Sequence, residues 1–253
     1  VRALLAQPGI SWCPRKSVAR LQRSPATSSA ATGDSTATGI WQALDDHGHT
    51  IAEAECVVLA AGPACNALLA ASSAPTLPLQ SVRGQLSWGR QDTGAAALPP
   101  FPVNGNGGLV AHVPREAGQA WHMGSTFERD VDALPLTCAE VAAGHATNWR
   151  RLQELLPNAA PALQAAFAST SPSDTAAVRA WASVRCTSTD RLPIVGPVDA
   201  QTLPGLWVCT AMGARGLTRA VLCGELLAAL VNAEPLPLDA RLTRAMGTAR
   251  LEK

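Results

Sequence analysis

Two short apolar segments, each followed by glycine, constrain the fold of this chain most strongly. The first covers residues 56–61 and ends at Gly62, and the second, residues 206–210, leads into a glycine loop. A short, wholly apolar run is typical of a strand that is buried on both faces of a sheet. In open α/β sheets, ligands collect just beyond the carboxyl ends of such strands. We therefore predict a Rossmann-like layer with a ligand site near Gly62.

The second segment is followed by Met212-Gly213-Ala214-Arg215-Gly216-Leu217 and then by an apolar helix predicted over residues 217–231. The first N–H groups of a helix have no partners within it, and the helix dipole adds partial positive charge there. Glycine permits close approach of the backbone to a ligand. The loop can thus bind an anion or an electron-rich oxygen, although G-x-R-G by itself favours an ordinary structural turn. We expect the small residues of the helix to face the sheet: Ala220, Gly224 and Ala228.

The middle of the chain has a different pattern, which predicts an antiparallel sheet and a helix. Residues 81–88 and 178–186 alternate as strands with one polar face do. Thr137 and Glu140 have the spacing of a capping box, which opens a helix that Pro157 ends. We predict an α/β chain (an α+β mix) with a partial Rossmann-like FAD-binding domain over residues 1–80 and 187–253. An antiparallel-sheet substrate domain, residues 81–186, is inserted into it.

Composition argues against several classes of protein. The net charge of +1 gives no polyelectrolyte signal for binding nucleic acid. No apolar stretch reaches the ~18 residues of a membrane span. The seven cysteines have no C-x-x-C spacing and the five histidines are scattered, so we expect neither a disulfide framework nor a metal site. A reducing, cytoplasmic location fits this cysteine usage.

Further segments near the glycine loop resemble a known enzyme family. Thr189-Asp190-Arg191-Leu192-Pro193-Ile194-Val195-Gly196 precedes the second apolar strand and its loop. This order resembles the family of FAD-dependent D-amino-acid, glycine and sarcosine oxidases. Val82-Arg83-Gly84-Gln85 and Val184-Arg185-Cys186-Thr187 narrow the resemblance to the oxidoreductase module of bifunctional tRNA 5-methylaminomethyl-2-thiouridine biosynthesis proteins. The similarity covers most of the chain.

The resemblance implies FAD as the cofactor and tRNA as the substrate. Modules of this kind oxidise the carboxymethylaminomethyl group of a wobble uridine and leave an aminomethyl group. Hydride passes from the methylene beside the carboxylate to the flavin, and the imine hydrolyses to the amine and glyoxylate. In the loop, Arg215 could contact either the reduced flavin or a tRNA phosphate. The resemblance implies these cofactor-binding residues: Val18, Gly62, Gly213, Ala214, Arg215, Gly216 and Leu217.

Arg185 has, by the same resemblance, the catalytic position of the arginine that holds the substrate carboxylate. A guanidinium can pair bidentately with a carboxylate and orient the carbon beside it. Strand alternation independently places Arg185 on a polar face, and the alternative is an ion pair with Asp190 or Asp199. Arg83 and Gln85 also share a polar face, so they could bind substrate or could lie on a solvated sheet surface.

One feature that the family needs is missing from the sequence. FAD is gripped through its pyrophosphate by a G-x-G-x-x-G turn between a strand and a helix, and these 253 residues contain none. We therefore expect the missing N-terminal FAD-binding segment, and a fused methyltransferase domain, as partners of this chain. Two other hypotheses stay open. The chain could be an oxidase of free amino acids or sarcosine-like amines, or a flavin-free fragment that serves as a binding or structural module.

Overall fold

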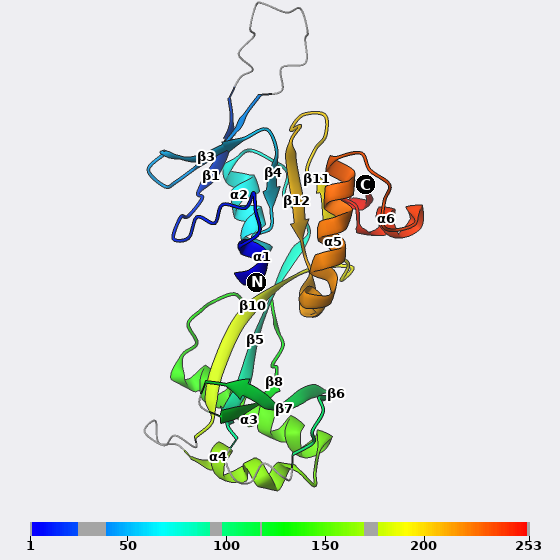
Figure 1. The fold of residues 1–253 in the computed structure, drawn as a ribbon. Coiled ribbons are helices and arrows are strands. Elements are labelled where there is room, and N and C mark those ends of the chain that lie inside the picture. Colours follow the sequence, from blue (N-terminus) through cyan, green and yellow to red (C-terminus); the bar gives the residue numbers. More distant parts are fainter. Residues whose placement is uncertain (1, 25–38, 92–97, 117, 170–176, 252–253) are drawn as a thin grey trace, which may run out of the picture. The chain divides into compact units, whose positions relative to one another are not determined.

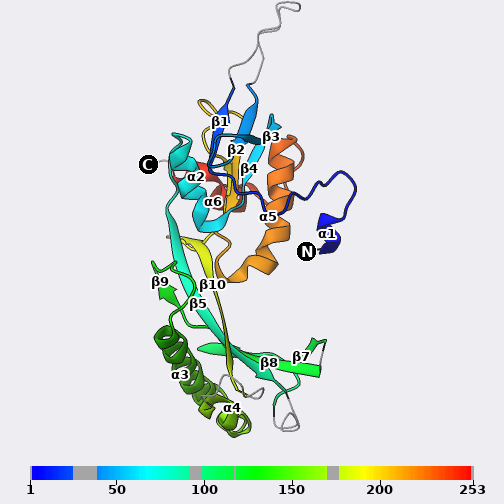
Figure 2. The same ribbon diagram turned by 90° about the vertical axis from the view of Figure 1, so that its left-hand side faces the viewer.

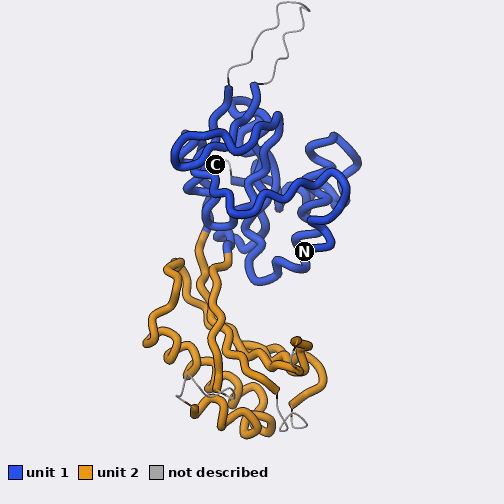
Figure 3. The backbone as a smooth tube through the Cα atoms, turned by 60° about the vertical axis from the view of Figure 1, so that its left-hand side comes forward, with its two compact units in different colours: residues 1–79, 186–253 blue, residues 80–185 orange. Residues whose placement is uncertain are grey.

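The computed structural model describes residues 2–24, 39–91, 98–116, 118–169 and 177–251. Backbone contacts divide the chain into two compact units, which Figure 3 draws in different colours. Unit 1 comprises Val1–Leu79 and Cys186–Lys253, and unit 2 is Gln80–Arg185. These boundaries differ by one residue from the predicted ones. Both units mix helices with strands, which confirms the predicted α/β (α+β) class.

Unit 1 contains a three-stranded sheet in the order β11–β12–β4 (Figure 1). The strands are β4 (Val57–Leu59), β11 (Ile194–Pro197) and β12 (Leu206–Thr210). β12 is parallel to β4 and antiparallel to β11. Helix α5 (Gly216–Val231) packs on this sheet, since its Cys223 and Leu226 share a buried cluster with Val195 of β11. The parallel pair followed by a helix is the predicted Rossmann-like element.

A second sheet of unit 1 has the order β1–β2–β3, with antiparallel pairing throughout. Its strands are β1 (Arg20–Arg23), β2 (Trp41–Leu44) and β3 (Thr50–Ala54). The indole N–H of Trp41 donates to the carbonyl of Pro204 at 2.9 Å, which ties this sheet to the loop before β12. Short elements complete the unit: α1 (Arg2–Leu5), η1 (Gly62–Ala64), α2 (Cys65–Ala71), η4 (Gly213–Arg215), α6 (Ala240–Met246) and η5 (Thr248–Leu251).

Unit 2 is built on a larger sheet in the order β10–β5–β8–β7–β6, with β9 paired to β5. The strands are β5 (Leu79–Arg90), β6 (Val103–Gly105), β7 (Gly107–Arg115), β8 (Gly118–Gly124), β9 (Glu128–Arg129) and β10 (Arg179–Ser188). The helices are α3 (Cys138–Leu155), η3 (Ala160–Leu163) and α4 (Gln164–Ala168). β5 and β10 each cross the boundary to unit 1, so the sheet and unit 1 are joined by two continuous strands.

The helix α3 begins at the predicted capping box. The Thr137 hydroxyl accepts from the Glu140 N–H at 3.3 Å, and the Glu140 carboxylate accepts from the Thr137 N–H at 2.8 Å. The helix ends at Leu155, just before Pro157, as predicted. Neither α3, with its 18 residues, nor any other described helix is long and apolar enough to cross a membrane.

One face of the large sheet lies against α3 (Figure 2). Gln85 of β5 donates to the Val141 carbonyl at 3.0 Å, and Asn148 of α3 donates to the Ser87 hydroxyl at 3.0 Å. Arg83 and Gln85 are accordingly only 3% and 1% exposed. The alternative that these two residues lie on a solvated sheet surface is therefore wrong, because a helix covers that face. Sequence alternation shows that a face is polar, but it does not show what lies over it.

Two expectations for unit 1 are also wrong. β4 is the last strand of its sheet and Val58 is 40% exposed, so the strand is not buried on both faces. Helix α5 packs through Cys223 and Leu226, whereas its small residues lie on the exposed side: Ala220, Gly224 and Ala228. The helix is apolar on nearly every side, so the spacing of apolar residues could not select the buried face.

Candidate active site

Two glycine turns follow the parallel strands of unit 1 and lie at the same edge of the sheet. Gly62 follows β4 and Gly213 follows β12, and the Thr210 hydroxyl lies 3.4 Å from the Gly62 carbonyl oxygen. The φ angles of the two glycines are +59° and +61°, a region that favours glycine. The structure thus brings these two predicted cofactor-binding residues together, at the carboxyl ends of parallel strands.

The last residues of β10 lie beside the two glycine turns. A Cβ atom added at Gly62 would lie 3.6 Å from Cβ of Cys186, and one added at Gly213 would lie 3.6 Å from Oγ1 of Thr187. Thr187 also forms an isolated backbone bridge with Met212. Cys186 and Thr187 belong to unit 1, and Arg185, the preceding residue of the same strand, is the last residue of unit 2.

Helix α5 presents its N-terminus at the second turn. The predicted loop residues Gly213–Arg215 form η4, and α5 begins at Gly216 with no side chain capping it. Its first N–H groups can therefore donate to a ligand, and the helix dipole favours negative charge there. Leu217 is 96% exposed. Ala211, which the sequence did not single out, has a φ of +61°, so the turn begins with a residue in a conformation that non-glycine residues rarely adopt.

Val18 occupies a different environment. It precedes β1 and is half-buried against a core cluster that includes Leu21, Trp41 and Leu59. These contacts account for its apolar side chain by packing alone. Its contact with the adenosine side of FAD stays a prediction.

Arg185 is half-buried on β10 in unit 2 and lacks a carboxylate partner among the residues that the structure describes. Its Nη2 donates to the Ser125 hydroxyl at 2.5 Å, and its guanidinium carbon lies 4.7 Å from the centre of the Phe127 ring. Its Nη1 is buried without a hydrogen-bond partner. Burial lowers the pKa of Arg185 from its ordinary value, but a guanidinium stays charged at neutral pH. A buried cation with an unused donor is suited to bind an anion.

Gly84 of β5 leaves the space that this guanidinium occupies. A Cβ atom there would collide with Nη1 of Arg185 and would lie 2.8 Å from the Thr126 carbonyl oxygen. Sequence reasoning missed the contributions of Gly84, Ser125 and Phe127 to this site. The only available signal was the position of Gly84 in the alternating pattern, opposite to Arg83 and Gln85.

The two aspartates weighed as ion-pair partners of Arg185 have other partners. Asp190 pairs with Arg250 at 2.8 Å, and this contact is the main cause that lowers the pKa of the Asp190 carboxyl. Asp199 accepts from the hydroxyl and the N–H of Thr202, at 2.5 and 2.9 Å. The alternative of a structural ion pair between Arg185 and Asp190 or Asp199 is therefore wrong.

Arg83, by contrast, is fully engaged within unit 2. Its Nη2 lies 2.5 Å from a Glu128 oxygen and 2.6 Å from a Glu140 oxygen, and its Nη1 donates to the Ala133 carbonyl at 2.8 Å. Gln85 is held under α3. These contacts favour structural roles for both residues, and a role in substrate binding stays a prediction.

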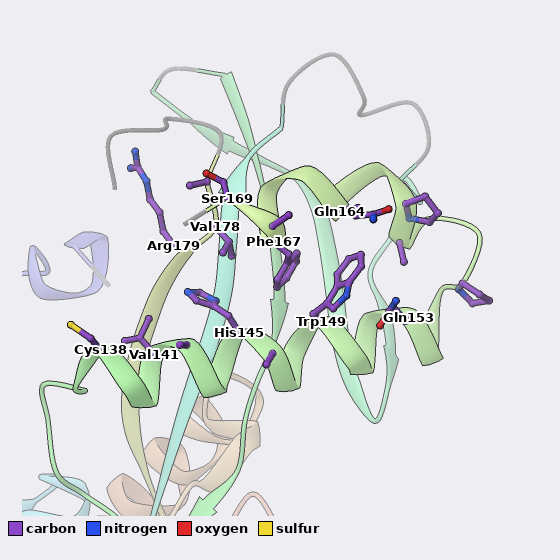
Figure 4. A pocket seen from close by; sticks show the side chains of 17 residues that line it. Cys138, Val141, His145, Trp149, Gln153, Gln164, Phe167, Ser169, Val178 and Arg179 are labelled. Atoms are coloured by element: carbon purple, nitrogen blue, oxygen red, sulfur yellow. The ribbon is translucent and has the colours of Figure 1, made fainter. Parts of the chain in front are cut away.

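A pocket of about 960 Å³ also lies in unit 2, between α3 and the segment of η3 and α4. His145, Trp149 and Phe167 line it (Figure 4). It is on the helix side of the sheet, and Arg83, Gln85 and Arg185 do not line it. The rings pack with one another, with Trp149 and Phe167 centred 5.0 Å apart. Among the described residues that line this pocket, the one charged side chain is Arg179 at its edge, so the candidate carboxylate site of unit 2 is Arg185 and not this pocket.

Comparisons with known proteins identify the family of this chain. The family described as "FAD dependent oxidoreductase" matches residues 13–230. The chain is 51% identical to the "tRNA 5-methylaminomethyl-2-thiouridine biosynthesis bifunctional protein MnmC" of Verminephrobacter eiseniae, over 99% of this chain and 40% of the relative. It is 52% identical to the protein of the same name from Paracidovorax citrulli, over 99% of this chain and 37% of that relative. The chain thus spans less than half the length of these relatives.

Solved structures show the same fold at low sequence identity. Glycine oxidase from Geobacillus kaustophilus aligns with a TM-score of 0.62 and 20% identity, covering 90% of this chain and 50% of that one. Iminodiacetate oxidase from a Chelativorans species aligns with a TM-score of 0.56 and 20% identity, covering 80% and 49% of the two chains. Because the family match covers residues 13–230, the chain belongs to the family of FAD-dependent oxidoreductases.

Proposed function

We propose that this chain provides the substrate-binding and flavin-ring parts of a FAD-dependent enzyme that modifies tRNA. The reaction removes the carboxymethyl group from 5-carboxymethylaminomethyluridine, with or without 2-thiolation, at the wobble position. The observation that carries the proposal is the buried guanidinium of Arg185, which has an unpaired Nη1 and no carboxylate partner in the described residues. The relatives named for tRNA 5-methylaminomethyl-2-thiouridine biosynthesis support a modified tRNA nucleoside as the substrate.

Arg185 acts by positioning the substrate. The modified uridine carries a secondary amine beside a methylene carboxylate, and Nη1 and Nη2 can hold that carboxylate in a bidentate pair. The Ser125 hydroxyl fixes the guanidinium, and Gly84 leaves room for it. A carboxylate fixed in this way sets the direction of the adjacent methylene carbon, which is the carbon that loses hydride.

The reaction is a two-electron oxidation followed by a hydrolysis. The methylene loses a hydride and the amine loses a proton, which together convert the C–N single bond to an imine. Water adds to the imine and splits it, and the products are the aminomethyl group on the base and free glyoxylate. FAD, when bound, supplies the two-electron acceptor that this oxidation needs.

The residues of unit 1 fit the ring end of the cofactor. Gly62 and Gly213, both with positive φ, leave the sheet edge open to close approach, and the uncapped N-terminus of α5 directs N–H groups outward. With FAD bound, such donors would stabilise the negative charge that the ring takes on during the oxidation. These residues would hold the ring: Gly62, Gly213, Ala214, Arg215, Gly216 and Leu217.

The remainder of the cofactor site needs a further segment. No glycine-rich strand-to-helix turn occurs in this sequence to grip the pyrophosphate. Exposed apolar side chains of unit 1 are suited to contact one, since Val58 on the edge strand β4 is 40% exposed and Val221 on α5 is 69% exposed. We propose that a glycine-bearing FAD-binding segment packs there and that, as in the bifunctional relatives, a methyltransferase domain is a further partner. We place the reaction in the cytoplasm.

A second candidate function is the oxidation of a free amino acid or a sarcosine-like amine, and the similarity of folds supports it. The similar solved structures are those of a glycine oxidase and an iminodiacetate oxidase. Arg185 could hold the carboxylate of such a small substrate equally well. The third possibility, a flavin-free binding or structural module, makes no use of the unpaired guanidinium.

One experiment separates these functions. The complete gene product that contains this chain is purified, its flavin absorbance is recorded, and it is incubated with tRNA bearing 5-carboxymethylaminomethyluridine, with glycine or with sarcosine. The proposal predicts a flavin spectrum, release of glyoxylate from the tRNA, and conversion of the nucleoside to its aminomethyl form. Turnover of glycine or sarcosine with no action on the tRNA would establish the free-amine oxidase instead. A protein that stays colourless after addition of FAD would establish the flavin-free module.

A further inference from the structure

The sheet of unit 2 has a second face, opposite α3, which we call the open face. On β5, Gln85 and Ser87 point to α3, whereas Gly84 and Trp88 occupy the alternate positions. Because a Cβ atom at Gly84 would meet the Arg185 guanidinium, Arg185 lies on the open face. The candidate carboxylate anchor and Trp88 are therefore on the same side of one sheet.

Four side chains from four neighbouring strands form a cluster around Trp88 on this face. One of them, Arg179 on the edge strand β10, also borders the pocket on the helix side. The guanidinium carbons of Arg115 and Arg179 lie 5.2 and 5.4 Å from the centre of the Trp88 ring. The His122 ring stacks on Trp88 with centres 6.1 Å apart and an angle of 15°, and its Nε2 lies 3.0 Å from Nη2 of Arg115. We call Trp88, Arg115, His122 and Arg179 the arginine–tryptophan cluster.

The cluster holds its cations without neutralising them. Arg115 and Arg179 are both exposed, and within the described ranges neither forms an ion pair with a carboxylate. The Trp88 ring instead orders them by cation–π attraction, which leaves the N–H edges of the guanidinium groups open to solvent. Burial, with a smaller effect of Arg115, lowers the pKa of His122, so this ring is neutral near pH 7 and can accept from Arg115.

A hollow of about 570 Å³ adjoins the cluster and shares Trp88 and Arg115 with it. Among the described residues, its lining contains Arg90 and Arg115 and one acidic residue, Glu116. The indole of Trp181, on the same strand and in the same alternation as Arg179 and Arg185, is exposed nearby, with an exposed fraction of 55%. The open face therefore combines local positive charge with apolar rings, although the whole chain has a net charge of only +1.

We propose that the arginine–tryptophan cluster is an RNA-docking surface that binds phosphodiester groups of the tRNA beside the modified uridine. The proposal rests on the function proposed above and adds how the polymer is recognised. Guanidinium groups match phosphate oxygens in charge and in bidentate geometry. From Gly84 to Trp88 the strand advances about 13 Å, at 3.3 Å per residue, so one sheet face can hold the carboxylate at Arg185 and phosphates farther along. A free amino acid would need only Arg185.

The test measures binding of tRNA to this chain and does not depend on FAD. Unmodified tRNA with a fluorescent label is titrated with the chain at several salt concentrations, and the chain is compared with the double variant Arg115→Ala/Arg179→Ala. We expect the double variant to bind about tenfold more weakly at low salt. The slope of log K against log salt should fall by about 1 for each arginine that contacts a phosphate. The matched control is Arg150→Ala. It removes an exposed arginine of α3, which lies on the other face of the sheet from the cluster, and it should leave binding unchanged.

A second variant separates charge from the guanidinium group. Arg115→Lys/Arg179→Lys keeps both charges, so it should retain most of the salt slope and lose part of the affinity. Each protein is checked by circular dichroism and thermal unfolding. The surface assignment is overturned if the double alanine variant binds tRNA as well as the unchanged chain, or if the unchanged chain does not bind tRNA. It is also overturned if polyglutamate displaces the tRNA as effectively as unlabelled tRNA does, which would indicate an acidic protein partner.

These outcomes are distinct from failure of the proposed function. If the complete gene product demodifies tRNA while the arginine variants bind it normally, only the docking surface is wrong. If the gene product oxidises glycine or sarcosine and ignores tRNA, the function itself is wrong. In addition, the double alanine variant in the complete gene product should raise KM for tRNA and leave kcat unchanged within about twofold, since the cluster contributes binding but no chemistry.

Discussion

Arg83 and Arg185 lie on neighbouring strands of one sheet, yet the two faces give them opposite environments. Arg83 is 3% exposed, lies under α3 and contacts two glutamates. Arg185 is on the open face, and its only hydrogen-bond partner in the described residues is the Ser125 hydroxyl. A buried cation with its carboxylates already in place contributes to the fold, whereas a buried cation without them is available to a ligand. Carboxylate partners, more than burial, thus distinguish the two arginines.

The substitution Arg185→Met in the complete gene product should have the largest effect. It removes the proposed carboxylate anchor, and we expect kcat/KM for the modified tRNA to fall by about 10³-fold. The melting temperature should stay the same or rise, because an unpaired buried donor is lost and an apolar side chain replaces it. Steady-state kinetics and thermal unfolding measure the two effects. Activity within a few-fold of the unchanged enzyme would contradict the assignment of Arg185.

The same substitution at the other arginine, Arg83→Met, should give the reverse pattern. Glu128 and Glu140 would face each other without a cation, and the Ala133 carbonyl would lose its donor. We expect the melting temperature to fall by several degrees, with kcat/KM of the remaining folded enzyme nearly unchanged. Arg150→Met on the exposed side of α3 is the control for loss of one charge. If Arg83→Met lowered kcat/KM as much as Arg185→Met does, the predicted role of Arg83 in substrate binding would regain support.

A substitution at Gly84 tests the space that the Arg185 guanidinium needs. In Gly84→Ala the new methyl group meets Nη1 of Arg185 and must displace it. A displacement of this kind can cost about 100-fold in rate, so kcat/KM should fall less than in Arg185→Met but clearly. The binding of unmodified tRNA should not change, since the arginine–tryptophan cluster is untouched. A variant with normal kinetics would show that the Arg185 guanidinium can bind the substrate from another position.

The contact between Arg83 and Glu140 should make the stability of the fold depend on pH. The hydrogen bonds of Glu140 to the Thr137 backbone, followed by those to Arg83, lower the pKa of its carboxyl from 4.5 to about 2. The unfolded chain therefore takes up this proton first, and the stabilisation is lost as the pH falls from 4.5 towards about 2. Glu140→Gln keeps a cap for α3 without this titration. Its urea midpoint should consequently decline less than that of the unchanged chain between about pH 6 and about pH 3. Equal declines would show that the Arg83–Glu140 pair has no share in acid stability.

How much of this arrangement could be predicted varies with the kind of pattern. The capping box at Thr137 and the apolar strands were readable, because local hydrogen bonds and burial determine them. Alternation placed Arg83 and Arg185 on polar faces, but it contained no information on which face α3 would cover. The surroundings of Arg185 were not readable either. Ser125 and Phe127 reach it from a loop some 60 residues earlier in the chain.

In helix α5 of unit 1, too, the sequence did not show which face is covered. A substitution in this helix should have the smallest effect. A Cβ atom added at Gly224 would meet nothing within 4 Å, so Gly224→Ala should raise the stability of this chain by up to about 1 kcal/mol through helix propensity. If a further FAD-binding segment packs on the exposed side of α5 in the complete gene product, the same methyl group would crowd that contact. The gain should then shrink or reverse there, which urea unfolding of both proteins can measure. An equal gain in both would mean that nothing packs against this side of the helix, and the site of the additional FAD-binding segment would have to be sought at the edge of β4 alone.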